Sequence, residues 1–198
     1  MSTAASWLMI FFHFAMPVYF MDVDQFSDDL ELVDVAEYSA PVWPGYDFDL
    51  GMDLHRGDNA LRLALAWGSL TLESSEDGRL ASFEEGYFTF LLGLKHRFGK
   101  HFALIAGSGI GMGGYDYDAH GETWDGRARR GYYLATPELA AELTFKRFGL
   151  GVSGRYHAIF GNAGDTYYGD MGHEDQGDFD LSRTALRVYL IICGSSRN

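Results

Sequence analysis

The chain has 198 residues, of which 28 are acidic and 15 basic, and its formal net charge is −13. This length fits one domain, and a hydrophobic content of 47% excludes a disordered acidic tail. The acidity also argues against nucleic acid as a partner, because binding it requires a cationic surface that displaces counterions. A single cysteine excludes an internal disulfide framework and any zinc site made of several cysteines. The 16% aromatic residues and 25 glycines indicate strands joined by glycine turns.

The first feature along the chain is an apolar run at residues 7–20, which contains His13 and Pro17. A helix that crosses a bilayer needs about 20 apolar residues, so this run is too short to be one. Its length matches the apolar core of an export signal. Residues 1–22 are therefore interpreted as an export signal, with a buried or interfacial segment as the alternative. Residues 23–29 are interpreted as a soluble spacer.

From Tyr46 onward, segments of about nine to thirteen residues alternate between two kinds of face, a period that indicates strands. One face is rich in Phe, Leu, Val and Ile, as in Phe88, Phe90 and Leu92. The other face is small, rich in glycine or sparsely charged. The fatty face suits lipid and the second face suits a crowded lumen, which is the pattern of a transmembrane barrel. Pro137 lies on the fatty face and predicts a local irregularity there.

The connections between these segments alternate strictly between short and long. Short turns fall at 55–59, 99–101 and 146–149, and long polar connections at 73–85, 114–130 and 161–180. Short periplasmic turns and long extracellular loops are typical of outer-membrane barrels.

The alternation of short and long connections also predicts the number of strands. A strand must precede Tyr46, and residues 30–38 are the candidate. We therefore expect an all-β fold: a single eight-stranded antiparallel up-and-down transmembrane β-barrel over residues 30–193. The chain would then end in a tail at 194–198, and both ends of the barrel would be periplasmic.

The stretch Tyr87–Gly113 combines an aromatic and leucine-rich strand, a tight turn and a glycine-alternating strand, and Tyr133–Tyr156 has the pattern of the following hairpin. In these features residues 46–192 resemble the superfamily of small bacterial outer-membrane β-barrel proteins. The resemblance implies a location in the cell outer membrane, contact with the lipid bilayer and lipopolysaccharide, and a monomer. The chain departs from the family at its end, since no aromatic residue closes the last strand and Gly194–Asn198 follow it.

An eight-stranded barrel has a lumen just wide enough to be filled by side chains, so we expect no open pore and no cofactor. Charges in such a space must pair or be hydrated. We expect a structural ionic network among inward-facing residues, which also include Asp47, Asp49 and Asp53. Its expected members are Arg62, Lys95, Arg97, Glu138, Glu142, Arg155, His157, Arg183 and Arg187.

His157 raises the alternative of a lipid A or lipopolysaccharide-modifying hydrolase. Some barrels of the superfamily use a His, a Ser two residues later and a Glu on a neighbouring strand. The position two residues after His157 is Ile159, however, and Ser153 lies roughly 13 Å away at strand rise. No catalytic residue is therefore assigned, and His157 is expected in the lumen near Glu138 or Glu142.

The long connections are acidic and aromatic, which favours a structural or surface-interaction role carried by the extracellular loops. Aromatic residues near the outer edge are interpreted as an interfacial belt: Tyr115, Tyr117, Trp124, Tyr132, Tyr133, Tyr167 and Tyr168. The candidate ligands of a divalent cation are Asp165, Asp170, Glu174 and Asp175. A further alternative is a soluble calycin-like binder of an apolar ligand, whose fatty faces would point inward.

Overall fold

The computed structural model describes residues 6–20, 45–76, 79–120, 125–169 and 182–196. The described residues form strands and tight turns. The strands are β1 Ser6–Phe20, β2 Gly45–Arg56, β3 Asn59–Glu76, β4 Arg79–Phe98, β5 Phe102–His120, β6 Asp125–Ala135, β7 Glu138–Phe145, β8 Phe148–Gly169 and β9 Arg183–Ser196. Among the described residues, no helix is long and apolar enough to cross a membrane.

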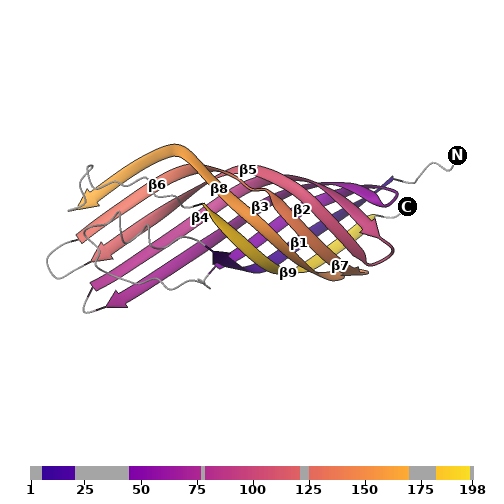
Figure 1. Cartoon of the computed structure of the whole chain (residues 1–198), viewed down its shortest axis with the longest axis horizontal. Helices are drawn as coiled ribbons and strands as arrows, with labels where there is room; N and C mark the ends of the chain where they lie inside the picture. The colour runs from indigo at the N-terminus through magenta and orange to yellow at the C-terminus, as the bar shows by residue number, and fades with distance from the viewer. Residues whose placement is uncertain (1–5, 21–44, 77–78, 121–124, 170–181, 197–198) are drawn as a thin grey trace.

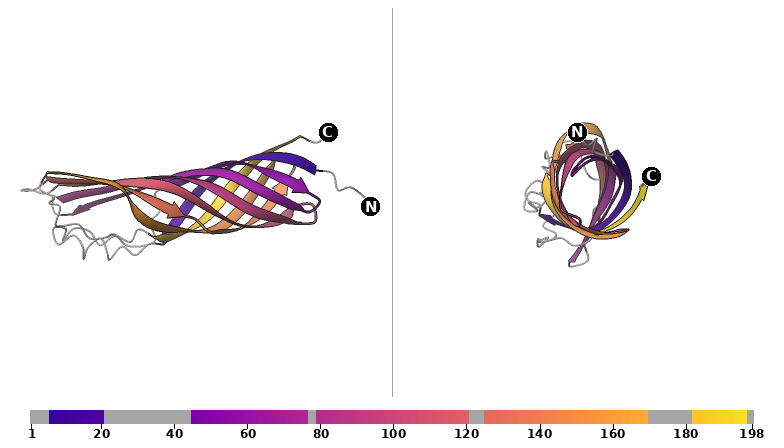
Figure 2. Two further views of the ribbon diagram at one scale, coloured as in Figure 1. Left: turned by 90° about the horizontal axis from the view of Figure 1, so that it is seen from above. Right: turned by 90° about the vertical axis from the view of Figure 1, so that its right-hand side faces the viewer.

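The strands close into one antiparallel barrel. Consecutive strands pair with each other except β6 and β7, and the ring closes where β1 pairs with β9. Both β6 and β7 pair with β5 on one side and β8 on the other, so together they form one wall strand and the ring has eight. The end view in Figure 2 shows the closed ring. The predicted eight-stranded up-and-down fold is confirmed.

The first strand differs from the prediction. Ser6–Phe20 forms β1, which pairs with β2 from Ser6 opposite Arg56 to Ala15 opposite Asp47. Residues 30–38, the predicted first strand, lie outside the described residues, and the place beside β2 belongs to β1. The apolar run is therefore a wall strand of the barrel and not a segment that precedes it. The barrel begins at residue 6 instead of residue 30.

The strand count from the turns was nevertheless right, because a strand does precede β2 and reaches it through a connection on the long-loop side. The two described ends of the barrel lie together at the short-turn end (Figure 1). The last strand extends to Ser196, so the predicted tail at 194–198 is largely part of β9.

We expect a cysteine at Phe11 to form a disulfide with the native Cys193. The two residues are register partners in β1 and β9, and both side chains are buried on the inner face. Paired residues in antiparallel strands lie roughly 4.5–5.5 Å apart at their Cα atoms, within the range of about 4.4–6.8 Å that disulfides require. Oxidation of Phe11→Cys should remove two thiols without forming a dimer, as measured by intact mass and thiol titration.

The control for this disulfide is Phe12→Cys, whose side chain points to the opposite face of the same strand. It should keep both thiols under the same oxidant. If the two variants behave alike, β1 does not close the barrel beside β9 in this register.

The irregularity predicted at Pro137 is confirmed. Regular strand structure stops at Ala135 and resumes at Glu138. Backbone hydrogen bonds keep the wall continuous at this break. Thr136 exchanges two with Gly109, at 2.9 and 3.0 Å, and the Pro137 carbonyl accepts one from the Tyr156 amide at 3.0 Å. The proline therefore costs one ladder donor without opening the barrel.

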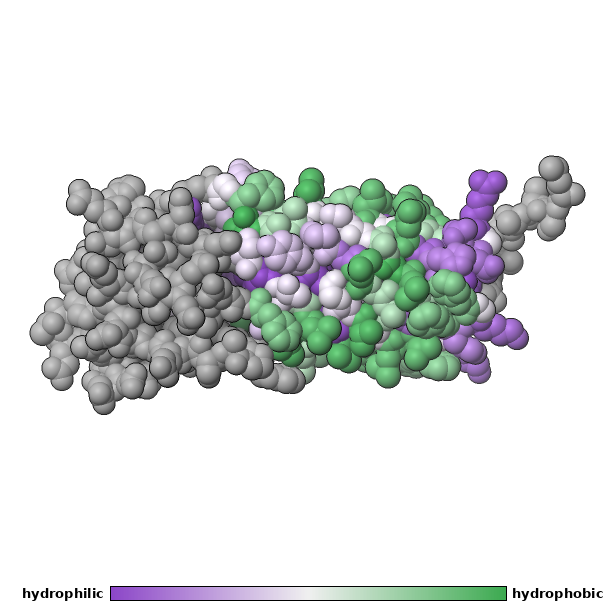
Figure 3. All heavy atoms as spheres, in the orientation of Figure 1, coloured by the Kyte–Doolittle hydropathy of each residue, from purple (hydrophilic) through white to green (hydrophobic). Residues whose placement is uncertain are grey.

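The fatty faces point outward. Phe88, Phe90 and Leu92 on β4 are 47%, 47% and 50% exposed, whereas Thr89 and Leu91 between them are 0% and 5% exposed. On the face that Figure 3 shows, apolar side chains cover the middle of the barrel and hydrophilic residues lie at its short-turn end. A calycin-like binder, whose fatty faces converge inside, is excluded by this arrangement.

The long connections are shorter than predicted, because most of their residues continue the strands. β3 runs to Glu76 and β4 starts at Arg79, while β5 runs to His120 and β6 starts at Asp125. The strands therefore project past the apolar band as a sheet made of β3, β4, β5, β6 and β8 (Figure 1). β8 bends where its register against β6 shifts, next to Gly161 with a φ of 65°.

Candidate functional site

The lumen is filled by side chains, and most of its described charged residues form two linked clusters. The turn-side cluster consists of Asp53, Arg62, Lys95 and Glu142. Arg62 lies 2.7 Å from Asp53 and 2.6 Å from Glu142, and Lys95 lies 2.9 Å and 2.6 Å from the same two carboxylates. Two cations and two anions thus compensate one another in a space from which bulk water is largely excluded.

The central cluster consists of Asp47, Asp49, Glu138, Arg155 and Arg187. Arg187 contacts all three carboxylates at 2.8 to 3.1 Å. Arg155 lies 3.3 Å from Asp49 and 3.2 Å from Glu138. Every one of these side chains except that of Glu138 is at most 5% exposed.

His13 of β1 links the two clusters. Its Nδ1 lies 3.2 Å from Asp49 of the central cluster, and its Nε2 lies 3.5 Å from Glu142 of the turn-side cluster. Sequence reasoning missed this residue because β1 was interpreted as an export signal. A histidine in an otherwise apolar run was the available clue, since a lipid-facing strand still has an inner face.

A third set of contacts closes the lumen toward the long-loop end. Arg183 lies 2.7 Å from Glu85, which also accepts a hydrogen bond from the Tyr132 hydroxyl. Tyr19 and Tyr87 both donate to Asp47. These tyrosines are not among the predicted site residues. From sequence alone, each resembles an aromatic residue of the outer wall, because its inward direction is not apparent.

Room for these aromatic side chains comes from glycines on neighbouring strands. A Cβ on Gly113 would lie 2.5 Å from the Tyr132 ring, and one on Gly151 would clash with Tyr189. The inward-facing glycines of β5 therefore serve packing in the lumen, as the alternating pattern predicts.

Most of the predicted network residues lie in these contacts, but two do not lie where they were expected. Arg97 lies at the short-turn mouth, where it donates to the Lys100 carbonyl at 3.2 Å. His157 is buried beside the rings of Tyr87 and Tyr19, at centroid distances of 4.8 and 6.2 Å. Glu138 and Glu142, its expected neighbours, pair with arginines and Lys95 instead, because those cations face them across the lumen.

The inward direction of His157 also bears on the hydrolase alternative. A hydrolase that acts on lipid A needs a histidine that its lipid substrate can reach, whereas His157 is 1% exposed inside the barrel. Ser153 is likewise buried on the inner face. The arrangement provides no lipid-facing nucleophile and base at these positions.

The projecting sheet carries exposed ion pairs. Arg129 of β6 contacts Asp116 of β5 at 2.5 Å, and Arg127 contacts Asp118 at 3.2 Å. The hydrogen bond from Arg129 lowers the pKa of Asp116. Such exposed pairs contribute at most about 1 kcal/mol each, so they hold the hairpin register more than they stabilise the barrel.

Not all of the predicted aromatic belt faces the membrane interface. Tyr133 is 44% exposed on the outer face, but Tyr115 and Tyr132 are buried at 5% and 2%. Alternation puts them inside, where Tyr115 stacks on Phe83 and Tyr132 reaches Glu85. The side chains of the other four members lie outside the described residues.

A groove of about 750 Å³ crosses the outer surface where the apolar band meets the projecting sheet. Four glycines from adjacent strands stand in register along it, namely Gly86, Gly114, Gly131 and Gly164. Glu84, Asp116 and Arg129 border them. This part of the outer surface is therefore recessed, because glycines carry no projecting side chains, and it is bordered by polar residues.

The proposed cation ligands are not brought together by described side chains. Asp170, Glu174 and Asp175 lie outside the described residues. Asp165 stands opposite Arg130 in the β6–β8 register, and its side chain is also outside the described part. Within the described residues, no group of three or more His, Cys, Asp or Glu has the arrangement of a metal site.

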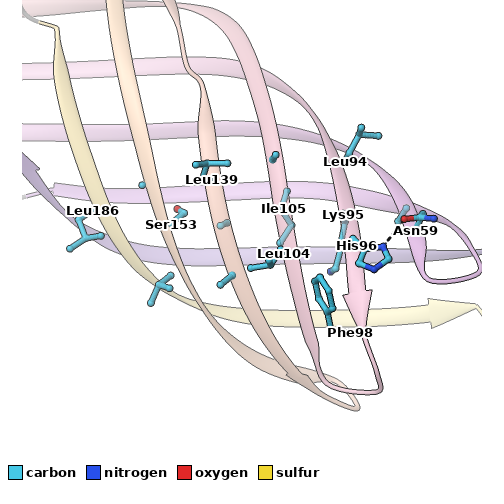
Figure 4. Close-up of a pocket in the computed structure, with 16 residues that line it drawn as sticks. Asn59, Leu94, Lys95, His96, Phe98, Leu104, Ile105, Leu139, Ser153 and Leu186 are labelled. Carbon is cyan, nitrogen blue, oxygen red and sulfur yellow. Dashed lines mark hydrogen bonds between the residues drawn. The ribbon is translucent and has the colours of Figure 1, made fainter.

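A depression of about 940 Å³ lies across the wall from β3 to β9 and is shown in Figure 4. Leu94 and Leu139, both 70% exposed, are among the side chains that line it. A hydrogen bond of 2.8 Å between His96 and Asn59 lies at its edge. The outward-facing apolar side chains along it, such as Leu94 and Leu139, belong to the lipid-contacting surface of the barrel.

The closed ring, the outward apolar band and the ion-filled lumen together define the fold of small eight-stranded outer-membrane β-barrels. No family model matches the sequence, and no curated protein matches it.

Solved structures do match the fold. Ail, the attachment invasion locus protein of Yersinia pestis, is 11% identical, with 95% of this chain and 98% of that chain covered at a TM-score of 0.57. A major outer membrane protein from Thermus thermophilus is 10% identical, with 94% and 99% covered at 0.58. Neisserial surface protein A (NspA) is 9% identical, with 93% and 96% covered at 0.56. A second Ail structure, in complex with the heparin analogue sucrose octasulfate, is 12% identical, with 96% and 99% covered at 0.55.

Proposed function

We propose that this protein is a bacterial outer-membrane barrel that presents an acidic surface to the outside of the cell and binds cationic partners there. The apolar band supports the membrane location, because exposed Phe, Leu and Ile side chains around the whole ring need lipid. The filled lumen supports a role other than diffusion, since paired buried charges occupy the space a pore would need.

The observation that carries the proposal is the division of charge between the two ends. Four segments, 21–44, 73–85, 114–130 and 161–180, contain the long connections and the strand ends next to them. Together they hold 22 of the 28 acidic residues but only four of the 15 basic ones. A field of one sign at a surface attracts partners of the opposite sign and repels others. The projecting sheet then serves as the rigid support of this surface.

On this proposal, the protein does not bind sulfated polysaccharides. The structure of Ail with a heparin analogue shows such a ligand on that protein. A polyanion would meet repulsion at the acidic end of this chain, so a cationic protein surface is the favoured partner.

Cells that display the protein should adhere to polylysine-coated beads at physiological ionic strength and not to heparin-coated beads. Changing Asp170, Glu174, Asp175, Asp178 and Asp180 to the corresponding amides should remove most of this adhesion, because the attraction depends on the summed charge. Bead retention counted by flow cytometry measures the effect.

The matched control changes Asp58 to Asn in the short turn at the opposite end, and it should leave adhesion unchanged. Protease protection in vesicles should show that all variants insert. Equal adhesion to heparin beads, or adhesion that survives the five substitutions, would contradict the proposal.

A further inference from the structure

The short-turn mouth of the barrel contains a small cationic cavity. It measures about 230 Å³, and its lining comes from β1, β2, β4, β5, β7, β9 and the adjoining turns. Six of the twelve lining residues are basic and none is acidic: His55, Lys95, Arg97, Lys100, His101 and Lys146. Pockets for drug-sized ligands start at roughly 300 Å³, so this volume fits a small anionic group.

The cations at the rim are available to a ligand. Lys95 is already engaged by Asp53 and Glu142, so its charge is compensated. No carboxylate among the described residues forms an ion pair with Arg97, Lys100 or Lys146. Arg97 is held in place by the Lys100 carbonyl and lies over the Trp7 ring, 5.8 Å from its centroid. Three positive charges therefore surround the opening.

His55 supplies a buried polar group at the base of the cavity. Its side chain is 1% exposed, and neither ring nitrogen has a hydrogen-bond partner among the described residues. The nearest carboxylate oxygen, on Asp53, is 4.0 Å away. The ring is fixed by stacking on Trp7 at 3.7 Å with an interplanar angle of 3°. A buried donor without a protein acceptor is costly unless a ligand or water satisfies it.

The position of the cavity indicates where its ligand comes from. Phe98 and Phe102 point outward at the same end, 51% and 37% exposed, as aromatic residues do at the edge of the hydrocarbon layer. An opening at this edge of the apolar surface would face lipid headgroup phosphates.

We propose that this cavity binds a phosphate group, with Arg97, Lys100 and Lys146 at its rim and His55 donating from its base. Arginine and lysine are the usual ligands of phosphate oxygens, and these hydrogen bonds are strengthened by charge. The group arrives either on a phospholipid headgroup or on a soluble phosphorylated compound. The inference depends on the fold and not on the surface role proposed above.

Calorimetric titration of the full chain in neutral detergent tests the proposal, with inorganic phosphate and dihexanoyl phosphatidylglycerol as separate probes. Saturable binding of phosphate would identify the free anion as sufficient, and saturation by the lipid alone would identify the headgroup. Lys146→Ala should weaken binding by about tenfold, because it removes one charge-assisted contact. His55→Phe should weaken it as well while preserving the stack on Trp7.

The matched control is Arg147→Ala, which removes the same charge from the neighbouring residue, one that does not line the cavity. It should leave the affinity within about twofold of the parent, since an exposed charge outside the site acts only through a screened field. Absence of saturable binding by both probes would overturn the proposal. So would equal losses in Lys146→Ala and Arg147→Ala, because these would show general attraction to a basic rim.

Discussion

Leu92→Arg is expected to prevent insertion of the barrel. Leu92 is 50% exposed in the middle of β4, and its outer face lies within the apolar band. An arginine on the lipid face near the midplane costs roughly 2–4 kcal/mol. The fraction of refolded protein that is protected from protease in phosphatidylcholine vesicles should therefore fall sharply.

Two further variants separate the cost of a charge near the membrane midplane from the loss of the leucine side chain and from the cost of a charge near the interface. Leu92→Ala should insert almost as well as the parent, because it removes contacts without burying a charge. Phe98→Arg at the end of β4 should cost only about 0–1 kcal/mol, since charges near the interface can reach water. If Leu92→Arg inserts as well as Leu92→Ala, the outer face of β4 does not contact lipid.

Arg62→Met is expected to destabilise the folded barrel by roughly 3–5 kcal/mol, the usual cost of removing one partner from a buried ionic group. The side chain of Arg62 is 7% exposed and lies against both Asp53 and Glu142. Its removal leaves Lys95 alone to compensate two buried carboxylates. Urea unfolding in vesicles, followed by tryptophan fluorescence, measures the change in free energy.

The comparison variant is Arg129→Met, which breaks an ion pair whose arginine side chain is 57% exposed. Its cost should be about 0–1 kcal/mol. The double variant Arg62→Met, Glu142→Leu should recover part of the loss, because one cation and one anion are removed together. If Arg62→Met costs no more than Arg129→Met, the turn-side cluster does not hold the lumen.

The barrel wall could be predicted from sequence because lipid and lumen impose opposite chemistry on alternate residues. In β4, Phe88, Phe90 and Leu92 share one face, and the small or sparsely charged character of the opposite faces of the strands gives the inside-out direction. The signal fails in β1, where the inner face is also fatty: Met9 and Phe11 are buried inside while Ile10 and Phe14 face out. With both faces apolar, the period of two disappears and the strand resembles an export signal.

Most members of the ionic network were predictable, but their partners were not. Arg62 meets Glu142, 80 residues away, across the lumen. Such a contact depends on the stagger and tilt of all eight strands, which no local pattern records. The projecting sheet was missed for a related reason: outside the membrane neither face contacts lipid, so its strands lose the alternation and read as polar loops.

The central claim is the direction of the side chains in the wall, and spin-label accessibility across residues 88–94 tests it most directly. Single cysteines would be introduced in a Cys193→Ala background and labelled in vesicles. Labels at Phe88, Phe90, Leu92 and Leu94 should be relaxed by oxygen, which concentrates in lipid, and labels at the positions between them should not. The account would be contradicted if oxygen relaxed the labels at the intervening positions instead. It would also be contradicted if a water-soluble nickel chelate relaxed the labels at Phe88, Phe90, Leu92 and Leu94.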